Sequence, residues 1–174
     1  MKKDSIIPIV VLTLICLFIS AALAITNSFT EPVITTAATE RAALARLEII
    51  PDAAGFELLN CDGLPATVGE AYRATNGAGY IFMVTVDGYG GDIGIICGVT
   101  EDGRIITTRV LLHNETKGIG AKVAEQAFGD QFAGMSGEMQ DVSAISGATI
   151  SSKAYVMAIR DALTAFEIVR GAGG

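Results

Sequence analysis

The longest apolar run in the chain covers residues 6–26, which are 21 consecutive residues without a charge. As a helix this run would be roughly 31 Å long, close to the hydrocarbon thickness of a bilayer, so it predicts a transmembrane helix. Lys2 and Lys3 precede it, and the positive-inside rule then puts residues 1–5 in the cytoplasm and the rest of the chain outside it. A cleaved signal peptide is the alternative, because Ala22-Leu23-Ala24 resembles a cleavage site, but the run is longer than a usual signal core.

Residues 27–52 are expected to form a helix or stalk beside the membrane. The segment 31–50 is rich in Ala, Leu, Glu and Arg and is bounded by Pro32 and Pro51, which suits a helix. One of its faces is apolar and consists of Ala43, Leu44, Leu47 and Ile50. The helix either packs on the domain that follows or continues the membrane helix as a stalk, and the pattern leaves both possibilities open.

Strand patterns fill most of the chain between residues 53 and 113. Three runs rich in Val, Ile and Thr are separated by turn residues, with Asp87-Gly88 after the first and Asp102-Gly103 after the second. An Asp-Gly pair between two apolar runs is a good hairpin signal. We therefore expect an antiparallel sheet of about four to six strands. The three runs are residues 79–88, 91–100 and 104–113.

Helical patterns return after Gly120. Short helical segments are expected at residues 121–127 and 130–133, followed by a loop and by a long helix over residues 152–170. In the long helix Tyr155, Ile159, Ala162 and Phe166 recur at spacings of four, three and four, so one face should pack on the sheet. Residues 53–174 are therefore predicted to be one domain of the α+β class.

Composition and charge exclude several functions. The net charge is −7, and the chain after Asp4 carries −8 with its basic residues scattered, which argues against nucleic-acid binding. All 20 glycines lie at or after Gly55, so residues 1–54 and residues 55–174 differ in composition. An apolar span without a charged residue offers no pathway for ions.

The cysteines and the single histidine give no zinc pattern, because Cys16, Cys61 and Cys97 are far apart and His113 has no histidine partner. Cys61 and Cys97 would face an oxidising compartment, where a disulfide is possible. Cys97 lies in a strand that looks buried, so a free thiol is favoured.

The most informative stretch is DVSAISGATISS, residues 141–152, which places small and hydroxyl residues directly before the last helix. Gly147 and Ala148 would let the backbone approach a ligand, and free N–H groups at the positive end of the helix dipole favour a phosphate. The hydroxyl groups that could add hydrogen bonds or an attachment point belong to Ser146, Thr149, Ser151 and Ser152. The alternative is ordinary N-capping by Ser151 or Ser152, and this stretch alone does not decide between the two.

Two further stretches carry a family resemblance. Residues 88–93 (GYGGDI) open a strand, and residues 113–121 (HNETKGIGA) follow another. Together with SGATISS, and in the same order, they resemble the FMN-binding domain of the G subunit of the Rnf electron-transport complex and of the C subunit of the sodium-translocating NADH:quinone reductase. The resemblance covers about residues 70–165, and the single N-terminal membrane segment also matches those subunits.

The resemblance implies a covalently bound flavin. In this family the Thr of the S-G-A-T block carries FMN through a phosphoester bond, and that residue is Thr149 here. A dedicated flavin transferase, with FAD as donor and Mg²⁺, is expected to make the bond outside the cytoplasm. Ser146, Gly147 and Ala148 would then surround the phosphate, and Lys153 would contribute positive charge there.

The stretch after the third run corresponds to the family pattern H-x-E-T-P-G-L-G, which the resemblance places beside the isoalloxazine ring. The matching residues are His113, Glu115, Thr116, Gly118, Ile119 and Gly120. Lys117 stands where Pro is usual, which leaves the loop less rigid and adds a positive charge. Without the resemblance, Glu115 would be interpreted as a solvated residue and His113 as a structural one. Tyr89, next to Gly90, either stacks on the flavin or simply ends a strand.

The leading hypothesis is therefore a membrane-anchored electron-transfer subunit that carries FMN within an ion-translocating ferredoxin:NAD⁺ oxidoreductase complex, with the other subunits of that complex as partners. The flavin would supply the redox chemistry, so no catalytic acid, base or nucleophile is required. A flavoprotein component of another extracytoplasmic electron-transfer system is the second hypothesis. A non-redox scaffold domain on a membrane anchor is the third.

Overall fold

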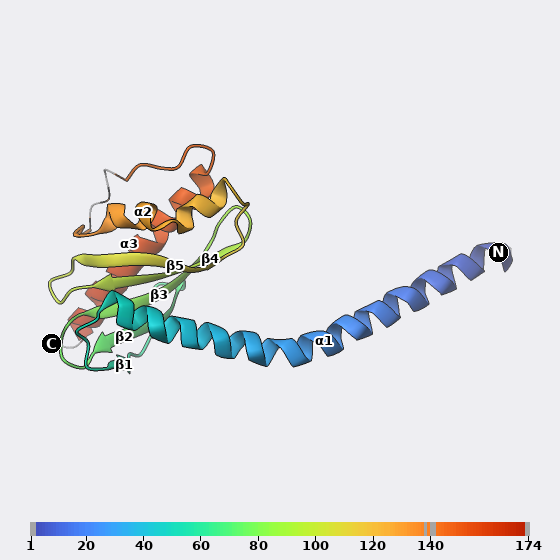
Figure 1. The fold of residues 1–174 in the computed structure, drawn as a ribbon, viewed down its shortest axis with the longest axis horizontal. Coiled ribbons are helices and arrows are strands. Elements are labelled where there is room, and N and C mark those ends of the chain that lie inside the picture. Colours follow the sequence, from blue (N-terminus) through green and yellow to red (C-terminus); the bar gives the residue numbers. More distant parts are fainter. Residues whose placement is uncertain (1–2, 138, 140–141, 173–174) are drawn as a thin grey trace. The chain divides into compact units, whose positions relative to one another are not determined.

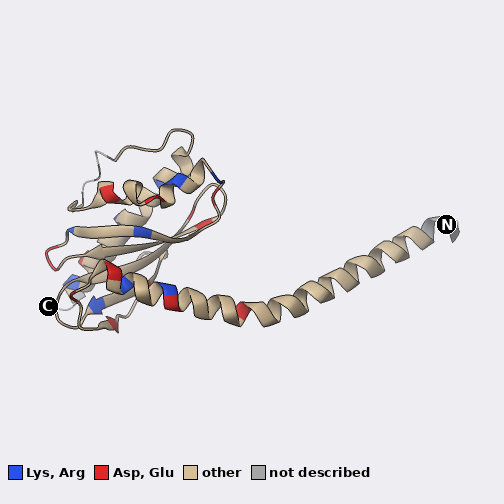
Figure 2. Cartoon of the chain, in the orientation of Figure 1, with Lys and Arg blue, Asp and Glu red and all other residues tan. Residues whose placement is uncertain are grey.

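The computed structural model describes residues 3–137, 139 and 142–172, and Figure 1 shows their fold. The first helix, α1, runs without a break from Lys3 to Ile49 and includes Pro32. Within the described residues it is the one helix long and apolar enough to cross a membrane. Figure 2 shows a long stretch of α1 without a charged residue, whereas acidic and basic residues recur toward its C-terminal end.

The chain divides into two compact units between Arg41 and Ala42. The last two turns of α1 therefore belong to the second unit, together with the sheet. The sequence left open whether this helical segment continues the membrane helix or packs on the domain. The helix is continuous, and the side chains of Ala45 and Ile49 are buried against the domain.

A five-stranded sheet forms the centre of the second unit. Its strands follow one another in the order β1-β2-β3-β4-β5, and every neighbouring pair is antiparallel. This confirms the predicted antiparallel sheet and the α+β class. The strands are β1 (Phe56–Leu58), β2 (Val68–Ala74), β3 (Tyr80–Asp87), β4 (Asp92–Val99) and β5 (Ile105–His113).

The two faces of the sheet pack against different helices because successive side chains of a strand point to opposite faces. Ile81 and Ile96 lie in one cluster with Ala45 and Ile49 from the end of α1 and with Ile50, which follows that helix. An ion pair between Glu48 and Arg109 also joins α1 to β5. Figure 1 shows the long last helix, α3, on the other side of the sheet from the end of α1.

The larger core lies between the sheet and α3 (Thr149–Ala172). Phe82 of β3 and the α3 residues Tyr155, Ile159 and Phe166 are fully buried there. Cys97 is also buried in this core, which raises the pKa of its thiol to about 12. Three short helices, η1 (Gly120–Ala124), α2 (Gln126–Gly129) and η2 (Asp130–Phe132), complete the cover of this face.

The cysteines are free thiols, as the sequence favoured. The Sγ atom of Cys61 lies 3.8 Å from the carbonyl oxygens of Leu59 and Gly69. Cys97 is enclosed in the core and is remote from solvent.

α3 begins three residues earlier than the sequence indicated. The Ser152 N–H already donates to the Ala148 carbonyl oxygen at 2.9 Å, so Thr149 is the first helical residue. Ser151 and Ser152 therefore lie inside the first helical turn, and the interpretation of either residue as the N-cap is wrong. The Ser152 hydroxyl instead accepts the N–H of Ile145, at 3.1 Å, and holds the preceding loop against the helix.

Candidate cofactor site

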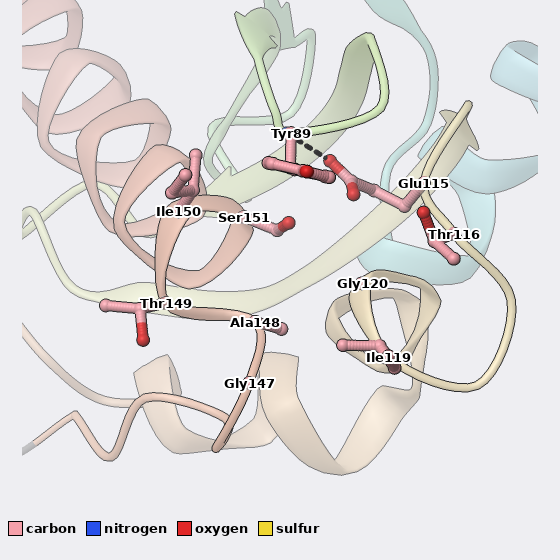
Figure 3. Close-up of a pocket in the computed structure, with 10 residues that line it drawn as sticks. All are labelled: Tyr89, Glu115, Thr116, Ile119, Gly120, Gly147, Ala148, Thr149, Ile150 and Ser151. Atoms are coloured by element: carbon pink, nitrogen blue, oxygen red, sulfur yellow. Dashed lines mark hydrogen bonds between the residues drawn. The ribbon is translucent and has the colours of Figure 1, made fainter.

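A cavity of about 510 Å³ lies beside the first turn of α3 (Figure 3). This volume lies in the range of roughly 300–1,000 Å³ that is usual for small-molecule sites. Its wall combines the turn between β3 and β4, the loop after β5, and the start of α3. The lining residues are Tyr89, Glu115, Thr116, Ile119, Gly120, Gly147, Ala148, Thr149, Ile150 and Ser151.

Glu115 joins two of these three segments. Its Oε1 atom accepts the N–H of Tyr89 at 2.7 Å and the N–H of Gly90 at 3.3 Å, which ties the loop after β5 to the β3–β4 turn. Glu115 is only 6% exposed, so its interpretation as a solvated residue is wrong. The N–H of Glu115 donates to Nδ1 of His113 at 3.3 Å, so the histidine side chain supports the same loop.

The Glu115 carboxylate occupies space that is free only because nearby residues are glycines. A Cβ atom at Gly88 would overlap Oε1 of Glu115, and one at Gly120 would overlap Oε2. A Cβ atom at Gly90 would overlap the carbonyl oxygen of Asn114. Gly88 and Gly120 are therefore needed because the chain packs closely around one acidic side chain, and Gly90 is needed because it packs against the backbone of Asn114. Gly88 was not among the site residues that the sequence indicated.

Two buried polar atoms in the cavity wall have no hydrogen-bond partner within the described part of the chain. They are Oε2 of Glu115 and Oγ of Ser151. An unsatisfied buried polar atom typically costs about 1–3 kcal/mol, and native structures keep few of them. Both atoms are almost entirely enclosed by other protein atoms, so they belong to the packing behind the cavity surface.

The start of α3 gives the site its anion-binding character. Gly147 has a φ of +81°, a backbone conformation that favours glycine, and it turns the chain into the helix. The Ala148 N–H donates to the Ile145 carbonyl oxygen at 3.0 Å, while the next N–H groups lie in the first turn and lack intrahelical acceptors. Thr149 is the first residue of the helix and its side chain is exposed, so its hydroxyl is accessible.

Apolar side chains cover much of the remaining wall. Tyr89 is 72% exposed, Ile119 is 51% exposed and Ile150 is 55% exposed, although all three line the cavity. Tyr89 lies beyond the end of β3, in the turn. Ile150 was not indicated by the sequence, where it lay in the loop expected before the helix. Its role as a wall residue depends on the earlier start of α3.

Besides His113 and Ser152, four predicted site residues lie outside the cavity lining. Lys153 is exposed and borders a separate surface hollow with Val156 and Arg160. Gly118 has a φ of +80° and belongs to the turn after β5, with open space around it. Gly90 contributes through its backbone N–H to Glu115, and Ser146 lies exposed in the loop before α3. Direct contacts of these residues with a cofactor stay predictions.

The comparison with protein families defines the class of domain. The profile of the family described as "FMN-binding domain" matches residues 88–164, a range that contains all three segments of the cavity wall. Residues 88–164 are therefore similar to an FMN-binding domain. Among the described residues there is no group of three or more His, Cys, Asp or Glu side chains that could hold a metal ion.

Relatives extend the match beyond this domain. The chain is 31% identical over 172 residues to the G subunit of an ion-translocating oxidoreductase complex from Methanosarcina acetivorans, covering 89% of this chain and 90% of that one. It is 28% identical over 176 residues to the G subunit of a Na⁺-translocating ferredoxin:NAD⁺ oxidoreductase complex from Acetobacterium woodii, covering 85% and 84%. The match to the G subunit of a proton-translocating ferredoxin:NAD⁺ oxidoreductase complex from Clostridium ljungdahlii is 30% identical over 103 residues and spans 53% of this chain and 56% of that one.

The chain therefore belongs to the family of G subunits of ion-translocating oxidoreductase (Rnf) complexes.

Proposed function

We propose that this chain is the membrane-anchored subunit that carries FMN, bound covalently through a phosphoester to Thr149, and relays electrons within an Rnf-type complex. The observation that supports this most directly is the position of Thr149. Its accessible hydroxyl lies at the first residue of a 24-residue helix and in the wall of a cavity of small-molecule size. The proposal also rests on the names of the relatives, which are subunits of such complexes.

The residues present fit FMN. The first-turn N–H groups of α3 and the positive end of its dipole suit a phosphate at Thr149. Gly147 keeps the backbone before the helix free of a side chain, and Ala148 is small. Tyr89, Ile119 and Ile150 offer apolar surface for the faces of a planar ring.

When bound, FMN supplies the electron acceptance and donation, and the protein supplies attachment, position and electrostatics. The phosphoester keeps the cofactor at high effective concentration, so a cavity that is partly open suffices to retain it. Thr149 holds the phosphate end of the cofactor, and Ser146 and Lys153 stand close in sequence to add polar contacts. Tyr89 and the loop of residues 116–120 border the same space.

The proposed membrane topology rests on the positive charges that precede the apolar segment. We place residues 1–5 in the cytoplasm, residues 6–26 in the membrane, residues 27–52 beside it and residues 53–174 on the outer side. A flavin transferase on the outer side is the partner required for maturation, and FAD would donate the flavin phosphate while AMP leaves. A mature protein about 2.5 kDa lighter than the full chain would contradict the retained anchor.

Attachment is tested by producing the full chain together with a flavin transferase. After denaturation, the protein should show flavin fluorescence and a mass increase equal to FMN minus water. Thr149→Ala should abolish both signals. Thr164→Ala is the matched control, because Thr164 is another exposed threonine of α3, remote from the cavity lining. If the Thr149→Ala protein keeps its covalent flavin, the attachment site is wrong.

The complex is tested separately by purification from membranes. Several integral subunits should accompany the flavoprotein if it belongs to an Rnf-type complex. A chain that carries covalent FMN but purifies alone would favour another extracytoplasmic electron-transfer system. A chain without any chromophore after exposure to the transferase would favour a scaffold domain.

A further inference from the structure

Three hydrogen bonds hold the turn that leads into α3. The N–H of Ala148 donates to the Ile145 carbonyl oxygen at 3.0 Å, and the N–H of Ser152 donates to the Ala148 carbonyl oxygen at 2.9 Å. The N–H of Ile145 in turn donates to Oγ of Ser152 at 3.1 Å. Residues 145–148 thus form a β-turn, and its third residue, Gly147, has the positive φ that a type II turn requires. Ser152 holds both ends of this turn.

A second side chain holds the loop just before the turn. The N–H of Ser143 donates to Oε1 of Gln131 at 2.9 Å. Nε2 of Gln131 donates to the Phe128 carbonyl oxygen at 3.5 Å, so the side-chain amide is bound through both of its polar atoms. Val142 and Ile145 are also partly buried against the larger core. Residues 142–148 therefore have a defined conformation that contacts in two other elements, η2 and α3, maintain.

The exposed part of this region is the tip of the turn together with the proposed attachment residue. Ser146, Gly147 and Thr149 are exposed, whereas Ala148 and Ser152 are buried. Figure 3 shows the chain passing from Gly147 through Ala148 into the first turn of α3. The N–H groups of a first turn lack intrahelical acceptors, and the backbone that carries them sets their direction. Because Ser152 fixes this backbone, the N–H groups beside Thr149 are oriented before a phosphate is attached.

Building on the proposed function, we propose that Ser152 and Gln131 are positioning residues that hold residues 142–148 in place and thereby fix the phosphoester at Thr149. Neither side chain lines the cavity, so both act through the backbone of the loop. A phosphoester alone keeps the cofactor at high effective concentration but leaves its orientation free. A preformed backbone lowers the entropy that is lost when the phosphate is ordered, so the cofactor takes one position.

The test uses the full chain, loaded with FMN by the transferase and purified in dodecyl maltoside, a detergent without phosphorus. Exchange of the backbone amide protons of Ser143 and Ile145 is measured by NMR. The ³¹P resonance of the phosphoester is measured on the same samples, and the loaded chain unfolded in urea gives the value for a free phosphoester. The wild-type resonance should differ from this value.

Ser152→Ala removes the hydroxyl group and keeps a good helix former, so α3 should be retained. The Ile145 amide should then exchange roughly three- to tenfold faster, as expected for the loss of one hydrogen bond. The covalent flavin should remain, but its ³¹P resonance should move toward the value of the unfolded chain. Gln131→Met removes the acceptor and keeps the length of the side chain. It should speed exchange at Ser143 and move the ³¹P resonance in the same direction.

Thr67→Val is the matched control. The Thr67 hydroxyl donates to Oδ2 of Asp161 at 2.7 Å, so this substitution also removes a hydroxyl contact with α3, but further along the helix and outside the cavity lining. It should leave the Ile145 amide and the ³¹P resonance unchanged. Near-ultraviolet circular dichroism verifies that each variant is folded. A purely structural role of Ser152 would weaken the domain as a whole without a selective change at the phosphoester.

The outcomes separate this inference from the proposed function. Absence of covalent flavin from the wild-type chain overturns the proposed function, and this inference with it. Covalent flavin with an unchanged ³¹P resonance in Ser152→Ala and Gln131→Met leaves that function standing and overturns the positioning role. A wild-type ³¹P resonance equal to that of the unfolded chain also overturns it. An equal response in Thr67→Val overturns the assignment to these two residues.

Discussion

Gly120→Ala is expected to destabilise the domain by about 2–4 kcal/mol because it displaces the Glu115 carboxylate. The added Cβ atom would overlap Oε2 and would lie 3.1 Å from the Cβ atom of Glu115. The carboxylate would then have to move away from Tyr89 and Gly90, whose N–H groups it accepts. Each hydrogen bond to a charged group contributes about 1.5–3 kcal/mol, and part of the loss is offset if the displaced carboxylate reaches water.

The assay is urea denaturation of the full chain in detergent, followed by near-ultraviolet circular dichroism, which reports the buried aromatic residues. Gly118→Ala is the matched control on the same loop. Gly118 has a φ of +80°, and an added Cβ atom would meet nothing within 4 Å. Its substitution should therefore cost only the backbone strain, roughly 1–2 kcal/mol.

A double substitution tests the cause directly. In a Glu115→Ala background there is no carboxylate to displace, so Gly120→Ala should add much less destabilisation than it does in the wild-type chain. The coupling between the two positions should be at least about 1 kcal/mol, as for other residues in direct contact. Independent, additive effects of the two substitutions would refute the explanation.

Two further predictions concern the core and the end of α1. Cys97 should resist alkylation at about pH 8 while Cys61 reacts, because burial raises the pKa of the Cys97 thiol to about 12 and keeps it protonated below that pH. Mass spectrometry before and after denaturation counts the labelled thiols, and modified Cys97 in the folded chain would contradict its burial. Gly98→Ala should loosen the end of α1, since the added Cβ atom would overlap Cγ2 of Ile49. Limited proteolysis should then cut residues 42–50 faster, and adding Ile49→Ala should slow the cleavage again.

Strands β3, β4 and β5 were predictable from the sequence because their signals are local, whereas β1 and β2 lie outside the three runs that the sequence indicated. Alternating apolar residues and Asp-Gly turns indicated the runs 79–88, 91–100 and 104–113, and the strands β3, β4 and β5 lie within them. The start of α3 was harder to predict from the sequence, because it depends on a hydrogen bond between the Ser152 hydroxyl and the N–H of Ile145. Such a contact is formed by the folded loop and has no separate signature in the chain.

The burial of Glu115 was also beyond local patterns. An acidic residue after a strand is usually solvated, and here its partners lie 25 and 26 residues earlier in the chain. The glycines at positions 88 and 120 were visible in the sequence, but their purpose appears only once the carboxylate lies between them. For Lys153, the sequence suggested a role that its position in the structure does not support. Its place near Thr149 in sequence suggested a phosphate contact, but Lys153 lines a separate hollow and is not part of the cavity lining.

The way α1 ends determines where a water-soluble version of this protein can begin. Ala45, Ile49 and Ile50 cover Ile81 and Ile96, so a chain cut immediately before β1 would leave those two sheet residues facing water. Removing this whole helix, which the sequence associates with the membrane, would therefore lower the solubility of the remaining domain. The natural starting point is Ala42, where the second compact unit begins, and it retains the covering residues while it removes the entire apolar span.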